Sequence, residues 1–335
     1  MTRALRFFDD SQPGITRKKM RHGWGYWDAK GDRITDREEI DRLNAVGLPP
    51  AYRDAWYSPH PNGHLQATGI DDRGRKQYRY HLDFRAAQEA AKYDRCPLFG
   101  LRLPKLRARI ETDLRKRSLS KERAVAAVVR LLDLGHVRVG NEQYAATNKS
   151  YGATTLRKRH AKLEGKTLKL QYRAKSGRVR VLTITDNSLL SFVKKVQDLP
   201  GQHLFRWMDD AGECHPVTST DVNDYIREAM NEDFTAKHFR TWGASAIAFE
   251  ALATSDGYVD LKSMLEPVTD ALGNTPAIAR KSYVHPALID LAKDREAQAA
   301  FREAVRLPRT ARYLSRAERG LIAFLEANCA TAKAA

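Results

Sequence analysis

The chain has 335 residues, of which 42% are hydrophobic and 30% charged, so it is long enough for two ordinary domains with separate cores. Its 58 Lys and Arg residues against 41 Asp and Glu residues give a formal charge of +17, which favours a polyanionic partner, most simply nucleic acid. We expect no membrane association, because no apolar run of 18 residues, signal peptide, basic amphipathic helix or lipidation motif is present.

The region up to residue 85 predicts a small, mainly β domain. It is rich in aromatic residues, Gly and Pro, and short alternating runs at 54–59, 64–70 and 76–81 predict strands. The sequences "PNG" and "DRG" between them are typical of turns. We therefore expect a first domain at residues 1–85.

From residue 86 the pattern becomes helical and predicts a second, larger domain at residues 86–335. Ser120 is a candidate N-cap for a helix over 121–135, whose Val125, Val128, Val129 and Leu132 share one face. Ser219 is a candidate cap for a second helix. The other predicted helices cover 85–96, 103–117, 237–254, 287–305 and 315–329. The expected fold class is therefore α+β.

One β-hairpin interrupts the helical region. Leu168, Leu170 and Tyr172 alternate along a first strand, "KSG" forms the turn, and a second strand carries Val179 and Val181. Lys175 is expected at the tip. A lysine there is ordinarily solvated, and it has a functional role only if the hairpin reaches into a groove.

Two arginines are candidates for anion binding. Arg138, in "GHVRVGNEQY", follows a helix end between apolar neighbours, and a buried guanidinium needs a carboxylate or a phosphate. Taken alone, a structural salt bridge is the simpler interpretation. Arg240, in "TAKHFRTWGAS", lies near a predicted helix start with Lys237 one turn earlier. This is either a phosphate site or a plain basic turn.

Tyr283 and Asn274 lie close together in "NTPAIARKSYVHP". Tyr283 is either a half-buried helix residue or a nucleophile, and Asn274 is most simply a turn residue after Gly273. Cleavage of a phosphodiester needs a nucleophile, donors for the non-bridging oxygens and an acid for the leaving oxygen. Tyr283, the two arginines and Lys175 would fill these roles together.

No metal site or cofactor motif is expected. The ten histidines and three cysteines include no HxxxH or CxxC pair. Cys96, Cys214 and Cys329 are far apart in the sequence and are predicted to be reduced thiols in a cytosolic or nuclear compartment.

Five ordered segments resemble type IB DNA topoisomerases of the compact poxviral and bacterial branch: "GIDDRGRKQYRYH", "VRVGNEQY", "RAKSG", "KHFRTWGA" and "NTPAIARKSYVHP". The resemblance runs over most of the chain. It implies a catalytic set of Arg138, Lys175, Arg240 and Tyr283, with Lys237 as an accessory DNA-binding lysine. Many relatives carry histidine nine positions before the tyrosine, where this chain has Asn274. Asparagine donates a neutral hydrogen bond, so we expect it to bind a phosphate oxygen.

The resemblance also implies the reaction. Tyr283 would attack one strand of duplex DNA and hold its 3′ end as a phosphotyrosine, while Lys175 protonates the leaving 5′ oxygen. The 5′-hydroxyl strand would then swivel and reseal. Because the bond energy is kept in the covalent intermediate, neither ATP nor a metal is chemically required.

The first of these segments implies a DNA-contacting surface in the first domain, formed by Arg75, Lys76, Gln77, Tyr78 and Tyr80. The alternative is a plain strand with Tyr78 and Tyr80 packed inward. The expected assembly is a monomer that clamps double-stranded DNA between its two domains. The expected location is the cytoplasm of a bacterium, with the nucleoid, or a virion.

Two other functions remain open from the sequence. A tyrosine recombinase shares the catalytic motifs, but recombinases usually have histidine three positions before the second arginine, where this chain has Lys237. A second difference is that the amino-terminal domain of recombinases is helical, whereas residues 1–85 of this chain are predicted to be mainly β. A non-enzymatic basic DNA-coating protein would account for the charge but not for the ordered motifs.

Overall fold

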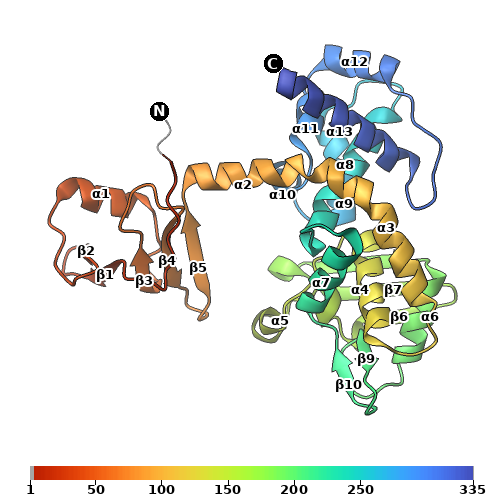
Figure 1. The fold of residues 1–335 in the computed structure, drawn as a ribbon, viewed down its shortest axis with the longest axis horizontal. Helices are drawn as coiled ribbons and strands as arrows, with labels where there is room; N and C mark the ends of the chain where they lie inside the picture. The colour runs from red at the N-terminus through yellow and green to blue at the C-terminus, as the bar shows by residue number, and fades with distance from the viewer. Residues whose placement is uncertain (1–3, 335) are drawn as a thin grey trace. The chain divides into compact units, whose positions relative to one another are not determined.

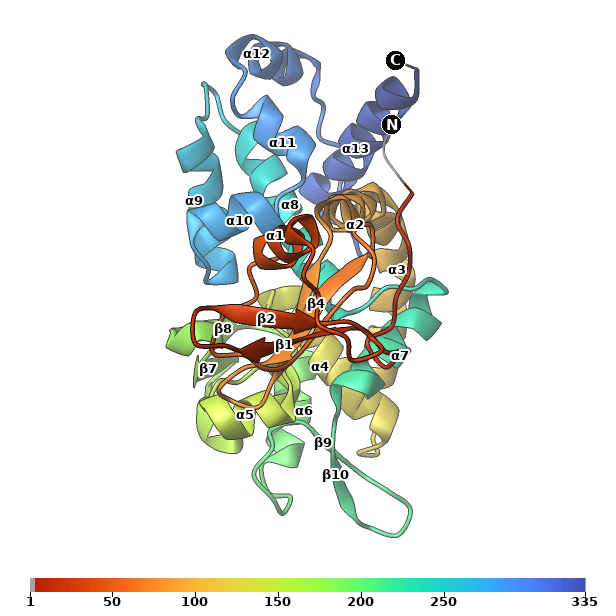
Figure 2. The same ribbon diagram turned by 90° about the vertical axis from the view of Figure 1, so that its left-hand side faces the viewer.

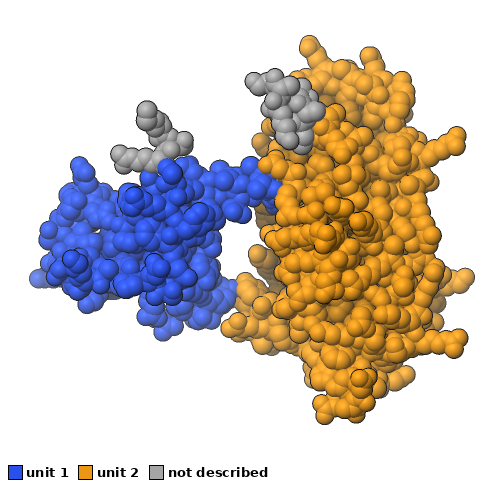
Figure 3. All heavy atoms as spheres, in the orientation of Figure 1, with its two compact units in different colours: residues 1–92 blue, residues 93–335 orange. Residues whose placement is uncertain are grey.

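The computed structural model describes the backbone of residues 4–334 and the side chains of residues 4–328. The chain divides into two compact units, residues 1–92 and 93–335, which are described separately here (Figure 3). The division expected between residues 85 and 86 falls inside helix α2 (Leu82–Asp94).

The first unit is a five-stranded antiparallel sheet in the order β2-β1-β3-β4-β5. The three predicted strands are present as β3 (Arg53–Tyr57), β4 (Leu65–Ile70) and β5 (Lys76–Tyr80). Sequence analysis missed β1 (Ile15–Lys19), β2 (Trp24–Trp27) and helix α1 (Arg37–Ala45), which Asp36 caps. The core of this unit contains Ile15, Tyr26, Leu43, Leu48, Ala55, Tyr57 and Ala67.

The second unit is mainly helical and has one large hydrophobic core. Its helices are α3 (Cys96–Leu114), α4 (Lys121–Gly135), α5 (Glu142–Asn148), α6 (Asn187–Val196), α7 (Ser219–Met230), α8 (Ala236–Ala253), α9 (Leu261–Leu272), α10 (Pro276–Ser282), α11 (Pro286–Leu291), α12 (Arg295–Ala304) and α13 (Arg316–Ala334). The strands β6 (Ala161–Glu164), β7 (Thr167–Arg173) and β8 (Val179–Ile184) form one sheet, and β9 (Arg206–Met208) pairs with β10 (Cys214–Pro216). The expected α+β class is confirmed.

Helix α4 lies at the centre of this unit, in contact with α3, α6, α7 and α8 (Figures 1 and 2). Ser120 caps it as predicted, and the four residues of its predicted apolar face are buried. It ends at Gly135, and the left-handed backbone of the next residue, His136 (φ 48°), turns the chain toward Arg138.

Two predicted helix boundaries were wrong. Thr218, rather than Ser219, caps α7, because its hydroxyl accepts from the Asp221 N–H while the Asp221 carboxylate accepts from the Thr218 N–H. The helix predicted over 287–305 is two helices, since Asp294 leaves the helical conformation to cap α12.

The hairpin formed by β7 and β8 has the predicted alternation but a different inward face on its second strand. Leu168 and Leu170 of β7 are buried, and the cross-strand partner of Leu168 is the buried Ile184. Val179 and Val181 are 65% and 52% exposed, so the even-numbered residues of β8 face inward. Arg180 is therefore directed toward the core side of the hairpin, opposite Tyr172.

A buried ionic network joins α13 to helices α3, α4 and α8. Arg107 of α3 donates to Asp133 of α4 at 2.8 Å and to Glu318 of α13 at 2.7 Å. The indole of Trp242 on α8 donates to the same Glu318 carboxylate at 3.0 Å. Among the described residues, no helix is both long and apolar enough to cross a bilayer. Cys214 is a free thiol, Cys96 is buried, and the side chain of Cys329 lies outside the described residues.

Candidate active site

Tyr283 ends helix α10, and the turn that follows it is held by α8. The Tyr283 N–H donates to the Ala279 carbonyl at 3.0 Å, and the buried Val284 anchors the next position. Ser245 of α8, which is fully buried, donates to the Tyr283 carbonyl at 3.5 Å and accepts from the His285 N–H at 3.0 Å. Sequence analysis missed Ser245, which lies five residues after Arg240 on the same helix.

The two arginines singled out in the sequence both approach Tyr283. A terminal nitrogen of Arg138, Nη2, lies 3.5 Å from the Tyr283 hydroxyl, and the guanidinium carbon of Arg240 lies 4.6 Å from the centre of its ring. Burial raises the pKa of Tyr283, but Arg240 and Arg138 together outweigh burial, so that its pKa is lowered from the ordinary value of 10.0. The two arginines therefore make the Tyr283 hydroxyl easier to deprotonate than that of a free tyrosine.

Arg240 is buried on α8, only 4% exposed. It donates to the carbonyl of His136 and, at 3.3 Å, to the carbonyl of Leu272. Its Nε atom is buried, with no hydrogen-bond partner among the described residues. Within that part of the chain, neither Arg138 nor Arg240 forms an ion pair with a carboxylate, so the salt bridge considered for Arg138 is not present. Cations placed without counter-ions form a site for an anion.

The segment that carries Arg138 is held by two close backbone approaches. The Arg138 carbonyl accepts from the Ala153 N–H at 2.8 Å, and the Val139 carbonyl accepts from the Thr154 N–H at 2.7 Å. A Cβ atom on Gly152 would lie 2.5 Å from the Arg138 carbonyl oxygen and 2.6 Å from the Gly140 nitrogen. Only glycine at position 152 lets these two segments lie side by side.

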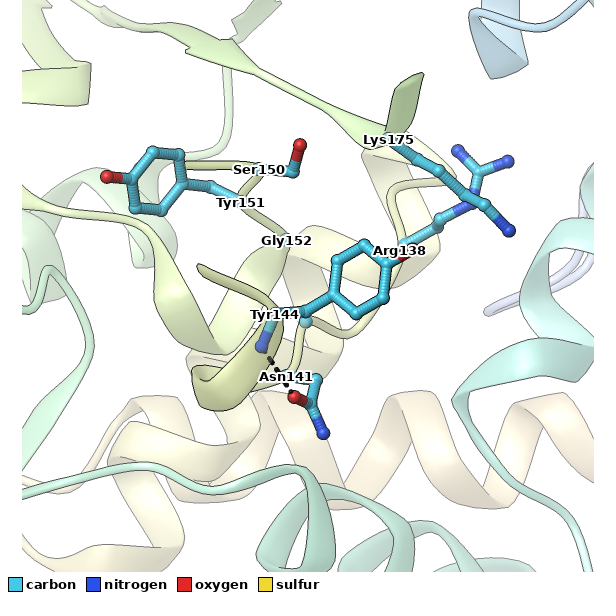
Figure 4. Close-up of a pocket in the computed structure, with 8 residues that line it drawn as sticks. Arg138, Asn141, Tyr144, Ser150, Tyr151, Gly152 and Lys175 are labelled. Carbon is cyan, nitrogen blue, oxygen red and sulfur yellow. Dashed lines mark hydrogen bonds between the residues drawn. The ribbon is translucent and has the colours of Figure 1, made fainter. Parts of the chain in front are cut away.

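Lys175 and Arg138 line one pocket of about 220 Å³. Figure 4 shows the two side chains together at one side of the pocket, with Tyr144 and Asn141 from the start of α5 among its other lining residues. The tip of the hairpin is tight, because Ser176 and Gly177 both have positive φ angles of 65° and 76°. Lys175 is exposed, so its ammonium is accessible to a bound molecule.

Asn274 follows Gly273, the left-handed residue that ends α9. It is only 9% exposed, and both its amide oxygen and its amide nitrogen are buried without a hydrogen-bond partner among the described residues. A turn residue would use its side chain to bond the local backbone. The Asn274 amide does not do so, and it is a buried polar group without a partner among the described residues. Helix α9, which precedes it, packs against both α8 and α10 (Figure 2).

Lys237, the second residue of α8, is exposed. In the first unit, Tyr78 and Tyr80 on β5 are 48% and 40% exposed and their rings stack 6.0 Å apart, so the alternative with both packed inward is wrong. Arg75 and Gln77 both donate to Asp71, at 2.8 and 3.0 Å, and Lys76 pairs with Asp10 at 2.5 Å.

One possible group of metal ligands lies elsewhere among the described residues, on the β9–β10 hairpin. Asp209 contacts His215 at 2.6 Å and accepts from the Glu213 N–H at 2.8 Å, so these residues already close the hairpin turn. Ligand spacing in the sequence did not single out this group.

Comparison with known families decides the identity. Residues 81–303 match the model of the eukaryotic DNA topoisomerase I catalytic core, and residues 23–71 match the bacterial DNA topoisomerase IB N-terminal domain. The chain belongs to the type IB DNA topoisomerase family. It is thus an isomerase of the DNA topoisomerase I class, and the resemblance found in the sequence is confirmed.

Among curated relatives, this topoisomerase is 32% identical over 285 residues to DNA topoisomerase 1B of Acanthamoeba polyphaga mimivirus, covering 81% of the chain and 85% of the relative. It is 26% identical over 199 residues to DNA topoisomerase 1 of Mycosarcoma maydis, covering 52% of the chain and 19% of the relative. A crystal structure of XerH site-specific recombinase in a post-cleavage complex matches with 17% identity and a TM-score of 0.40, over 59% of this chain and 50% of that one.

Proposed function

We propose that this topoisomerase breaks and rejoins one strand of double-stranded DNA through Tyr283. The observation that carries the proposal is the position of the Tyr283 hydroxyl, 3.5 Å from Arg138 and on a ring that Arg240 covers. Neither arginine has a carboxylate partner among the described residues. A scissile phosphate would supply the missing negative charge and place its phosphorus within reach of the nucleophile.

In the proposed reaction, the Tyr283 oxygen forms a bond to phosphorus as the bond to the 5′ oxygen breaks. Arg138 and Arg240 stabilise the charge that develops on the non-bridging oxygens, and they are in place before the reaction begins. Asn274 donates a neutral hydrogen bond to one of these oxygens, consistent with its unpaired buried amide. Lys175 gives its proton to the departing 5′ oxygen, which leaves as a hydroxyl.

The product is a 3′-phosphotyrosyl intermediate and a free 5′-hydroxyl end. Rotation of the free end relaxes supercoils of either sign, and attack of the hydroxyl on the phosphotyrosine restores the strand and releases Tyr283. The number of phosphoester bonds is unchanged throughout. The chemistry therefore needs no ATP, and Lys175 supplies the acid that a metal-bound water would otherwise provide.

We assign DNA contact to residues 1–85 and catalysis to residues 86–335. The exposed Tyr78 and Tyr80, with Arg75, Lys76 and Gln77 beside them, would contact the duplex, and the exposed Lys237 would contact a phosphate near the site. The protein would act as a monomer that clamps the duplex, in the bacterial cytoplasm with the nucleoid or in a virion.

The test is a relaxation assay combined with detection of the covalent adduct. The wild-type protein should relax negatively and positively supercoiled plasmid in EDTA without ATP, and it should form a protein–DNA adduct visible on a denaturing gel. Tyr283→Phe should bind duplex with unchanged affinity but form no adduct. An adduct formed by the Phe variant would overturn the assignment, and a strict need for ATP or a divalent metal would overturn the mechanism.

A further inference from the structure

Arg180, on strand β8 of the hairpin, binds the ends of two helices. Its Nη2 donates to the carbonyl of Gly135 at 3.4 Å, at the last residue of α4, and to the carbonyl of Ala271 in the last turn of α9. Its Nη1 donates to the carbonyl of Asp270 at 3.1 Å. Carbonyls in the last turn of a helix have no partner within the helix and carry the negative end of its dipole. One guanidinium therefore fastens both ends together.

Arg240 makes the same kind of connection one residue further along each helix end. It donates to the carbonyls of His136 and Leu272, which directly follow the Gly135 and Ala271 bound by Arg180. The ends of α4 and α9 are thus joined by two arginines. Arg240 also covers the Tyr283 ring, whereas Arg180 connects the same pair of helix ends to the hairpin.

Each element that Arg180 joins leads directly to a residue of the proposed site. The chain passes from the Gly135 end of α4 to Arg138, and from the Ala271 end of α9 to Asn274. Strand β8 leads back from Arg180 to Lys175 at the hairpin tip. We propose that Arg180 is a positioning residue that fixes Lys175, Arg138 and Asn274 relative to one another through these three elements.

Gly273 shows how closely Arg180 is fitted. A Cβ atom at this position would lie 2.4 Å from Arg180 Nη1 and 3.1 Å from its Cδ, and the residue has a φ of +63°. The left-handed glycine both ends α9 and leaves room for the guanidinium. Arg180 forms no ion pair with a carboxylate among the described residues; besides the helix carbonyls, its guanidinium interacts with the hydroxyl of Tyr172, its cross-strand partner on β7.

The inference rests on the proposed function, and single-turnover cleavage of two DNA substrates tests it. One is normal duplex, and the other carries sulfur at the 5′ bridging position, from which a thiolate leaves without an acid. The variants are Arg180→Ala, Arg180→Lys and Lys175→Ala, with Arg178→Ala as the matched control because it removes an exposed charge from the same hairpin. Rates are expressed per folded molecule, and the folded fraction of each variant is measured by thermal unfolding.

Arg180→Ala should cleave normal DNA about 10- to 100-fold more slowly than Arg178→Ala, since small displacements of catalytic groups cost rate of this order. The sulfur substrate should restore only part of this loss. It removes the need for the acid Lys175, but it does not compensate for displacement of Arg138 and Asn274. Arg180→Lys should be intermediate, since a single ammonium lacks the planar fork that reaches both helix ends.

Equal cleavage of normal DNA by Arg180→Ala and Arg178→Ala would overturn the inference. Complete recovery of Arg180→Ala on the sulfur substrate would overturn the three-way role. If Arg180→Ala does not fold, a wild-type cleavage rate for folded Arg180→Lys would overturn the inference. Failure of sulfur to rescue Lys175→Ala would remove the proposed acid instead, while the comparison of the two alanine variants on normal DNA would still test positioning.

Discussion

The guanidinium carbon of Arg240 lies 4.6 Å from the centre of the Tyr283 ring, and the same guanidinium donates to the carbonyls of His136 and Leu272. One buried side chain thereby connects the proposed nucleophile to the ends of α4 and α9. These backbone contacts hold Arg240 in the free protein. Its charge is therefore placed before DNA binds, which is the condition under which electrostatic stabilisation of a transition state is most effective.

The proposed acid gives the first prediction. Lys175→Ala should cleave normal DNA poorly and recover when the 5′ bridging oxygen is sulfur. Arg138→Ala should recover much less, because Arg138 lies next to the Tyr283 hydroxyl and its proposed role is at the phosphoryl oxygens. Single-turnover cleavage on both substrates is the measurement. Equal defects of Lys175→Ala on the two substrates would exclude Lys175 as the acid.

Asn274 should show opposite effects on rate and stability. Its amide has no partner among the described residues, and a buried polar group without a partner costs about 1–3 kcal/mol. Asn274→Ala should therefore unfold at the same or a higher temperature while cleaving about 100- to 1,000-fold more slowly, as for loss of one oxyanion donor. Asn274→His should keep substantial activity, since an imidazole N–H can replace the amide donor. A lowered melting temperature with normal cleavage would make Asn274 structural.

Gly152 tests the segment that carries Arg138. Gly152→Ala places a methyl group against the Arg138 carbonyl and the Gly140 backbone, so it should destabilise the protein by about 1–3 kcal/mol and slow cleavage. Gly257→Ala is the matched control, because a Cβ there meets nothing within 4 Å. Chemical denaturation and single-turnover cleavage check both effects. Indistinguishable behaviour of the two variants would contradict the close approach.

His285 gives a prediction about acid stability. Burial lowers its pKa to about 4, and its Nδ1 accepts from the Ala287 N–H at 3.2 Å to cap α11. The unfolded chain, with a His pKa near 6.5, binds the proton more readily. His285 thus stabilises the fold fully above about pH 6.5, and this contribution falls as the pH drops toward 4.

His285→Asn should keep the cap, because asparagine is a favoured N-cap residue, but it removes this proton. The free energy of unfolding should then fall less steeply between pH 6.5 and 4, by up to about 1 kcal/mol per pH unit. Denaturation at several pH values measures both slopes. His160 and His238 also have pKa values lowered to about 4 by burial, so some acid sensitivity should remain in the variant. Equal slopes in the two proteins would contradict the prediction.

Local sequence pattern predicted most helices and the hairpin because their signals lie within a few residues, as with Ser120 before the apolar face of α4. The grouping of Arg138, Arg240 and Tyr283 was inferred from the ordered motifs, whereas spacing along the chain carries no information on a contact 145 residues apart. Arg180 and Ser245 gave no signal, because their roles depend on backbone carbonyls and amides that any residue provides. The inward direction of Arg180 depends on strand register, which alternation alone leaves undetermined.

The network of Arg107, Asp133, Trp242 and Glu318 has a consequence for synthesis of the chain. Arg138, Lys175, Arg240 and Tyr283 all leave the ribosome before Glu318, the carboxylate that binds both Arg107 of α3 and Trp242 of α8. Until α13 follows, the helix that carries Arg240 lacks one of its supports, and Arg107 lacks half of its counter-charge. A nascent chain thus contains every residue of the proposed site before the carboxylate that binds both α3 and α8 has been synthesised.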